Sequence, residues 1–245
     1  MSYQWNWSVF TQETSVGDGS TYWTWMLAGL KMTVTVSLSA WLLALALGCL
    51  VGVLRTVPSK GWRRAATAYV EVLRNIPLLV QLFIWYFIVP ELLPKGWGDA
   101  IKQMPPDVQQ MGAAIVCLGL FTSARVSEQV RAGIQSLPIG QTRAALALGL
   151  TLPQAYRLVL LPMAFRLVVP PLTSEFLNIF KNSAVCSTIG LLELAAQGRQ
   201  LVDYTAQPYE SFIAVTLMYL LINVVVMGLM SLVERKVRVP GYMGQ

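Results

Sequence analysis

The segment most informative about the architecture of this chain reads Gln141-Thr-Arg-Ala-Ala-Leu-Ala-Leu-Gly-Leu-Thr-Leu-Pro-Gln-Ala-Tyr-Arg-Leu-Val-Leu-Leu-Pro162. Residues 141–148 are good helix formers, and Gly149 permits a sharp bend because it has no Cβ atom. Pro153 falls at the start of a second short helix, residues 154–161, where its missing N–H is tolerated. Long apolar runs flank the segment. A bent helix pair between membrane spans is suited to docking a partner protein.

The overall composition is that of a membrane protein. Charged residues make up 12% of the chain and hydrophobic residues 55%, against about 25% and about 45–50% in soluble domains. The 245 residues accommodate about five spans of about 20 residues each, with short connections. The chain has no histidine, and its three cysteines lack a metal-binding spacing, so we expect neither His-based catalysis nor a metal site.

Five apolar segments predict an all-α integral membrane protein with five transmembrane helices. The fourth of these segments is interrupted by polar groups. The five segments cover residues 25–54, 65–89, 108–130, 167–196 and 209–233.

Basic residues predict the orientation of these spans. The segment before the first span, residues 1–24, contains no Lys or Arg, whereas every alternate connection after it is basic. The positive-inside rule therefore predicts an external N-terminus and a cytoplasmic C-terminus. The net charge of +6 then reflects topology, and we expect no binding of nucleic acid. The basic residues on the predicted cytoplasmic side are Arg55, Lys60, Arg63, Arg64, Arg131, Arg143, Arg157, Arg166, Arg235, Lys236 and Arg238.

This topology divides the chain into three parts. Residues 1–24 form an external N-terminal segment, and residues 25–233 form the five-span transmembrane domain. Within that domain, residues 132–166 form a cytoplasmic loop that contains the bent helix pair. Residues 234–245 form a cytoplasmic tail.

The second span contains the run Tyr-Val-Glu-Val-Leu-Arg-Asn-Ile-Pro-Leu-Leu-Val-Gln at residues 69–81. Glu71 and Arg74 lie three residues apart, so on a helix they share a face and can form an ion pair. Pro77 is expected to kink the helix. Because the run lies near the cytoplasmic end, we favour a structural or gating ion pair over ligand binding.

The third span ends with charged residues at Arg125, Glu128 and Arg131, each three residues from the next. A guanidinium within a span is costly unless an anion compensates it. Two explanations stay open: a resident ion pair between Arg125 and Glu128, which we favour slightly, or a transported carboxylate that Arg125 binds bidentately. The second explanation would select acidic amino acids.

The fourth span carries polar residues at helical spacing on an otherwise apolar helix. Such a stripe faces a partner helix or a water-filled path, because lipid would penalise it. Interhelical contact and a lining of the substrate path are the two alternatives. The candidate path residues of the third and fourth spans are Arg125, Glu128, Glu175, Asn178, Lys181, Asn182, Ser183 and Thr188.

Residues 141–162 resemble the EAA loop of ABC-importer permeases, in which a bent helix pair inserts into a cleft on the ATPase. The family pattern is Glu-Ala-Ala, three residues, Gly, nine residues, Ile, one residue and Leu-Pro. This chain departs from it at Arg143, where Glu is usual, and at Val159, which replaces Ile. The resemblance implies that the ATPase-coupling residues are Arg143, Ala144, Ala145, Gly149, Leu161 and Pro162.

Other segments, including residues 69–81 and the Lys-Asn-Ser-Ala-Val-Cys-Ser-Thr-Ile-Gly run at residues 181–190, are similar to permeases for polar amino acids. Over its length the chain resembles a bacterial glutamate/aspartate permease subunit. The resemblance implies a type I ABC importer permease fold in the bacterial inner membrane, working by alternating access. Alternatives are a permease for another polar amino acid, such as glutamine, and an ion-coupled secondary transporter.

The expected partners follow from the same resemblance. They are a second permease, identical or distinct, an ABC ATPase dimer, a periplasmic amino-acid-binding protein and the lipid membrane. The chain has no Gly-x-x-x-x-Gly-Lys-Ser/Thr phosphate loop, so we expect no cofactor here and no enzymatic activity. ATP and Mg²⁺ would bind to the ATPase.

Overall fold

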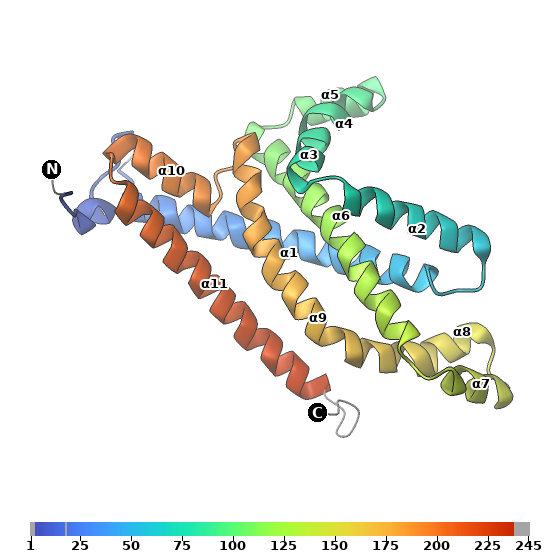
Figure 1. Cartoon of the computed structure of the whole chain (residues 1–245). Helices are drawn as coiled ribbons and strands as arrows, with labels where there is room; N and C mark the ends of the chain where they lie inside the picture. Colours follow the sequence, from blue (N-terminus) through green and yellow to red (C-terminus); the bar gives the residue numbers. More distant parts are fainter. Residues whose placement is uncertain (1–2, 18, 238–245) are drawn as a thin grey trace. The chain divides into compact units, whose positions relative to one another are not determined.

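The computed structural model describes residues 3–17 and 19–237 (Figure 1). Apart from an isolated bridge between Glu13 and Thr21, these residues contain no β structure. The regular elements in chain order are η1 (Trp7–Thr11), α1 (Tyr22–Leu54), α2 (Lys60–Asn75), α3 (Leu78–Phe83), η2 (Ile84–Ile88), α4 (Val89–Leu92), α5 (Lys95–Lys102), α6 (Pro106–Gln135), α7 (Ile139–Ala147), α8 (Leu152–Ala155), η3 (Tyr156–Leu160), α9 (Leu161–Asn182), η4 (Ser183–Ile189), α10 (Leu194–Thr205) and α11 (Pro208–Val237).

The predicted all-α membrane fold is confirmed. Four helical stretches are long and apolar enough to cross a membrane: Tyr22–Leu54, Pro106–Gln135, Leu152–Ile189 and Pro208–Val237. A broken pair, Lys60–Asn75 with Leu78–Leu92, makes a fifth span if it is taken as one. The structural stretches extend beyond the predicted apolar segments because the helices continue into polar residues at their ends.

The second predicted span is not one continuous helix, which corrects the expectation for residues 65–89. The residue before a proline is pushed towards extended backbone, and Ile76 adopts φ −95° and ψ 128°. Pro77 has no N–H to donate to a helix. As a result α2 ends at Asn75 and α3 begins at Leu78.

The fourth predicted span also ends earlier than expected. After α9 the backbone tightens into the 3₁₀ helix η4, which terminates at Gly190 with a left-handed φ of 90°. The hydroxyls of Ser183 and Thr188 donate to the carbonyls of Phe180 and Val185, three residues back. Residues 194–196, predicted to belong to this span, instead begin the separate helix α10.

The bent helix pair is present, with one correction. α7 ends before Gly149, whose φ of 83° turns the chain in a left-handed conformation that suits glycine. The second helix does not stop at residue 161. Instead, α8 continues through the π-helical turn η3 into α9. This turn opens the backbone directly before Pro162, where a regular helix would clash with the proline ring.

The chain forms two compact units. The first contains the described parts of residues 1–40, 77–118 and 178–225. The second contains the described parts of residues 41–76, 119–177 and 226–245. In the second unit α1 approaches α6 closely, because a Cβ atom at Gly48 or Gly52 would lie 2.6 or 2.7 Å from a valine of α6.

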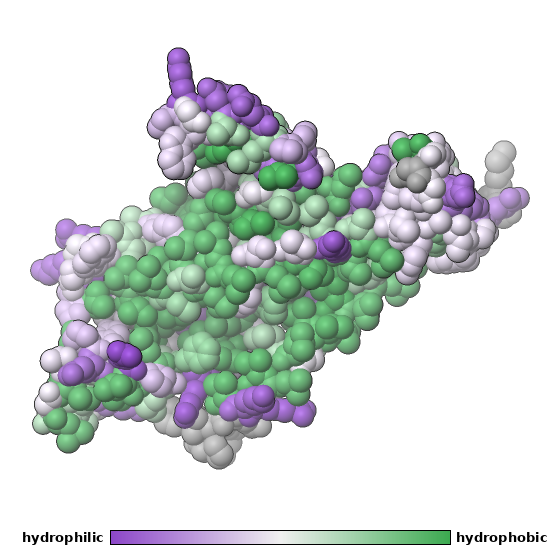
Figure 2. Space-filling model, turned by 180° about the vertical axis from the view of Figure 1, so that it is seen from behind, coloured by the Kyte–Doolittle hydropathy of each residue, from purple (hydrophilic) through white to green (hydrophobic). Residues whose placement is uncertain are grey.

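Large apolar side chains are exposed over much of the surface, as Figure 2 shows for one face. Helix α11 is the clearest case, since only 22% of its most apolar window is buried. Such a surface is stable only against lipid or another apolar partner. The residues of α11 that are more than half exposed include Leu217, Leu220, Leu221, Val224, Val225, Met227 and Leu229.

Candidate functional site

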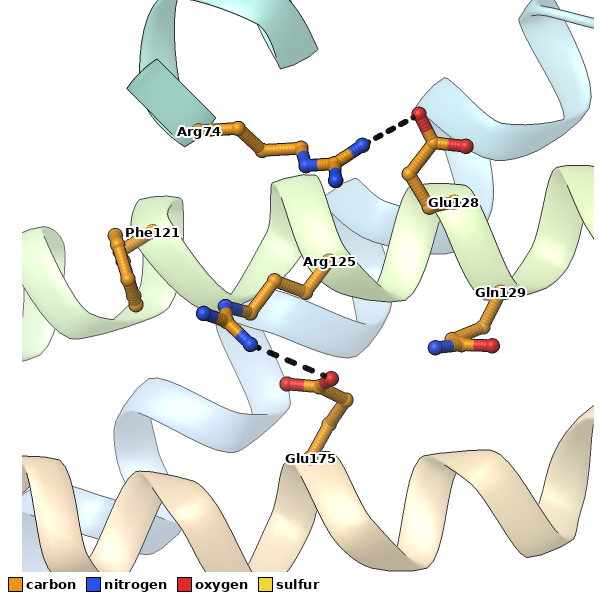
Figure 3. Close-up of a pocket in the computed structure, with 6 residues that line it drawn as sticks. All are labelled: Arg74, Phe121, Arg125, Glu128, Gln129 and Glu175. Carbon is orange, nitrogen blue, oxygen red and sulfur yellow. Dashed lines mark hydrogen bonds and ion pairs between the residues drawn. The ribbon is translucent and has the colours of Figure 1, made fainter. Parts of the chain in front are cut away.

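A charged pocket of about 290 Å³ lies in the second compact unit (Figure 3). It brings together three helices, α2, α6 and α9, and it combines two arginines, two glutamates, an amide and an aromatic ring. The lining residues are Arg74, Phe121, Arg125, Glu128, Gln129 and Glu175.

Arg125 pairs with Glu175 of α9, so the predicted Arg125–Glu128 ion pair is wrong. The guanidinium Nη1 lies 3.7 Å from Glu175 Oε1, and Figure 3 shows the two groups directed at each other. The guanidinium carbon also lies 5.2 Å from the centre of the Phe121 ring, one helical turn away. A separation of 3.7 Å is too long for a hydrogen bond. The Oε2 atom of Glu175 is buried without a hydrogen-bond partner among the described residues, so both groups retain capacity for a ligand.

Glu128 is instead the centre of a network of three arginines. Its Oε1 atom lies 2.9 Å from Nη1 of both Arg55 and Arg74. Its Oε2 atom accepts from Nε and Nη2 of Arg131, at 3.0 and 2.8 Å. The expected shared face of Glu128 and Arg131 is therefore confirmed.

The predicted Glu71–Arg74 ion pair is wrong. Arg74 leaves its own helix and reaches Glu128 on α6, whereas Glu71 accepts a long 3.4 Å bond from Asn75. The carboxylate of Glu128 is only 20% exposed, and ion pairs in such surroundings are screened less by water than pairs on an exposed helix surface.

Arg55 is a member of this network that sequence reasoning assigned only to topology. Its side chain is 7% exposed, although it follows directly after the last residue of α1. No local pattern distinguishes it from the other basic residues of the connection, because its partner Glu128 is distant in the sequence.

The remaining predicted path residues belong to the first compact unit and do not line this pocket. Lys181 and Thr188 are exposed, and Ser183 is buried. The hydroxyl protons of Ser183 and Thr188 are directed to backbone carbonyls. A role of Asn178, Lys181, Asn182, Ser183 and Thr188 along a substrate path stays a prediction.

The predicted coupling residues occupy the exposed α7 turn and the region after it. Arg143 and Ala144 are exposed, and Ala145 is buried. Leu161 and Pro162 line a separate apolar pocket of about 340 Å³. The same turn exposes large apolar side chains, including Ile139 at 67% and Leu148 at 83%. Such side chains mark a surface that a partner would cover.

The helical membrane fold and the charged pocket between its helices are those of a transport protein. Residues 44–239 match the family model described as "Binding-protein-dependent transport system inner membrane component", and the chain belongs to this family. The predicted resemblance to ABC-importer permeases is thereby confirmed, and the chain is a permease subunit, not the ATPase.

Individual relatives narrow the comparison. The glutamate/aspartate import permease protein GltJ of Escherichia coli (strain K12) is 54% identical over 245 residues, covering 100% of this chain and 99% of that protein. The glutamate/aspartate import permease protein GltK of Escherichia coli O6:H1 strain CFT073 is 29% identical over 212 residues, covering 86% of this chain and 93% of that protein. The crystal structure of an amino acid ABC transporter with histidines has a TM-score of 0.74 and 31% identity, covering 88% of this chain and 95% of that chain.

Proposed function

We propose that this chain is a permease subunit of an ATP-driven importer of acidic amino acids, glutamate and aspartate. The observation that carries the proposal is the pocket in which Arg74 and Arg125 lie with Glu128 and Glu175. An acidic amino acid carries two carboxylates and one ammonium group, so it requires two cationic partners and one anionic partner. The close similarity to a glutamate/aspartate permease supports the same substrate class.

The pocket assigns a role to each charged group. Arg125, whose side chain is 46% exposed, binds one carboxylate bidentately and releases Glu175. Arg74, whose side chain is 51% exposed, binds the other carboxylate. The freed Glu175 carboxylate accepts the substrate ammonium group. The volume of about 290 Å³ lies at the small end of the range for ligand pockets, which suits an amino acid.

A neutral side chain would leave one guanidinium without an anion, and this argues against glutamine as the preferred substrate. The site loses more free energy from an unpaired charge than it gains from a new amide hydrogen bond. Substrate selection in this proposal is therefore a matter of charge count within the pocket.

The proposed assembly contains a second, distinct permease. In Escherichia coli O6:H1 strain CFT073, two proteins carry the name glutamate/aspartate import permease protein, and this chain is 54% identical to one and 29% identical to the other. That asymmetry favours a heterodimer over two copies of this chain. An ATPase dimer that binds ATP and Mg²⁺, and an external amino-acid-binding protein, complete the transporter.

The proposed mechanism is alternating access, with the N-terminus outside and the C-terminus in the cytoplasm. The binding protein delivers the amino acid, and closure of the ATPase dimer moves α7 through its exposed apolar side chains. The permease pair then reorients around the bound substrate. Arg143, in the position where the family usually has Glu, would pair with an acidic side chain of the ATPase.

Uptake by the purified complex in proteoliposomes tests this proposal. Labelled glutamate, aspartate, glutamine and arginine are compared with and without enclosed ATP, in the presence of the binding protein. We expect ATP-dependent uptake of glutamate and aspartate only. Preferred uptake of glutamine would replace the substrate assignment, and uptake that follows an ion gradient without ATP would contradict the importer mechanism itself.

A further inference from the structure

A second charged pocket, distinct from the proposed substrate pocket, lies where two membrane helices end. Its volume is about 520 Å³, and it is formed by the end of α1, the first part of α2 and the last turns of α6. We call it the arginine pocket. Its lining residues are Arg55, Arg63, Arg64, Thr67, Ala68, Glu71, Arg131 and Gln135.

The arginine pocket carries an excess of positive charge that the described protein groups do not neutralise. Four of its lining residues are arginines, and only one, Glu71, is acidic. Glu128 lies outside the lining but already serves Arg55, Arg74 and Arg131 together. Within the described part of the chain, no ion pair joins Arg63 or Arg64 to a carboxylate.

One arginine of the pocket is held inside the protein. The Arg55 side chain is only 7% exposed, and its Nε atom is buried without a hydrogen-bond partner among residues 3–17 and 19–237. A buried N–H of a charged group that lacks an acceptor is costly. An anion with several oxygen acceptors would satisfy it, and phosphate fits the guanidinium geometry.

The position of the pocket points to the membrane as the source of the phosphate. Arg55 follows Leu54, the last residue of a membrane-spanning helix, and Arg131 and Gln135 belong to the last turns of another. Beside them on α2, Trp62 is 62% exposed, as is typical of indole rings at the headgroup level. Basic pockets between the ends of membrane helices bind anionic headgroups.

We propose that the arginine pocket binds the phosphate headgroup of an anionic phospholipid, such as phosphatidylglycerol. Arg63 and Arg64 contact the phosphate from the α2 side, and Arg55 supplies its free Nε–H from the protein side. The lipid thereby fixes α2 against the ends of α1 and α6, on the same side of Glu128 that Arg131 occupies. This inference does not depend on which amino acid the transporter carries.

The complex that co-purifies with the full chain provides the test. It is delipidated, placed in nanodiscs of phosphatidylcholine with increasing phosphatidylglycerol, and the tightly retained phosphatidylglycerol is measured by native mass spectrometry. Arg64→Ala removes one pocket charge, and Arg63→Ala/Arg64→Ala removes two. Lys60→Ala is the matched control, because it removes one exposed charge from the same helix outside the pocket lining.

We expect retention to fall about fivefold for Arg64→Ala and about thirtyfold for the double variant, on the basis of about 1 kcal/mol for each basic residue near an anionic bilayer. Lys60→Ala should change retention less than about twofold. Equal retention in all variants would contradict the proposal.

Two further arms identify the occupant. Inorganic phosphate or glycerol phosphate at millimolar concentration should not displace the retained lipid; displacement would mean that the pocket takes a soluble phosphate. If Arg63→Ala/Arg64→Ala releases the ATPase from the complex while lipid retention stays normal, the pocket docks a partner protein and the lipid assignment is wrong.

Discussion

At the scale of single residues, Arg125 shows how the chain accommodates a charge within a membrane helix. Its guanidinium lies 3.7 Å from Glu175 and over the ring of Phe121, so both an anion and a π face compensate it. The nearer acid in the sequence, Glu128, is not its partner, because three other arginines surround that carboxylate. Spacing along one helix identified the charged groups but paired them incorrectly.

Replacing Arg125 by Leu removes the proposed carboxylate ligand. We expect the kcat/KM for glutamate uptake to fall at least about thirtyfold, which corresponds to about 2 kcal/mol for a lost charge-assisted hydrogen bond. Arg125→Lys keeps the charge but not the bidentate geometry, and should give an intermediate loss. Basal ATP hydrolysis by the complex should persist in both variants. Unchanged glutamate uptake by Arg125→Leu would remove Arg125 from the substrate site.

Replacing Glu128 by Gln leaves the buried Arg55 without its counter-ion. Breaking a buried pair by removing one partner typically costs about 3–5 kcal/mol, so we expect a clear drop in the thermal unfolding temperature of the complex. Glu71→Gln is the matched control, because Glu71 is exposed and forms no printed ion pair within the described residues. It should change stability by less than about 0.5 kcal/mol. Equal effects of the two variants would mean that the arginine network contributes no stability.

At the scale of elements, proline and glycine placed the breaks. Pro77 separates α2 from α3, and Gly190 ends η4, whereas Pro162 is accommodated by a π turn and does not end its helix. Gly149 makes the turn after α7 because its φ of 83° is accessible to glycine without strain. The exposed apolar residues Ile139 and Leu148 flank this helix.

Gly149→Ala tests whether the geometry of this turn is needed for coupling. A Cβ at residue 149 would meet no atom within 4 Å, so its effect comes from the left-handed backbone, at about 1–2 kcal/mol. We expect a lower ratio of substrate transported to ATP hydrolysed in proteoliposomes. Gly140→Ala, at the other end of the same helix, also has open space around it and no positive φ, and should leave the ratio unchanged. Normal coupling in Gly149→Ala would show that the turn tolerates distortion.

At the scale of the whole molecule, the chain is a set of apolar helices with much of its apolar surface unburied. α11 leaves most of its apolar side chains exposed, and the exposed α7 turn carries further apolar groups. A single chain of this kind is therefore stable only within lipid and with partner subunits. Its charge distribution sets the orientation in the membrane.

Labelling of single cysteines tests the predicted topology. Cys49, Cys117 and Cys186 are replaced first, and a cysteine is then introduced at Trp97 or Leu148, which are 74% and 83% exposed. A membrane-impermeant thiol reagent added to intact cells should label Trp97→Cys and not Leu148→Cys. The reverse pattern would invert the orientation and place the α7 turn on the side opposite to the ATPase.

What the sequence determined by itself were properties carried by local composition. Apolar runs of about 20 residues specify membrane helices in any context, and the bend at Gly149 depends on the backbone of one residue. These features, with the presence of Arg125 and Glu128 as charged groups within a span, were predictable. Only the tertiary structure decided how those charges pair, because the length of a guanidinium side chain lets it reach several helices. The burial of Arg55 and the pairing of Arg125 with Glu175 depend on segments far apart in the chain, and no local spacing records which of them lie together.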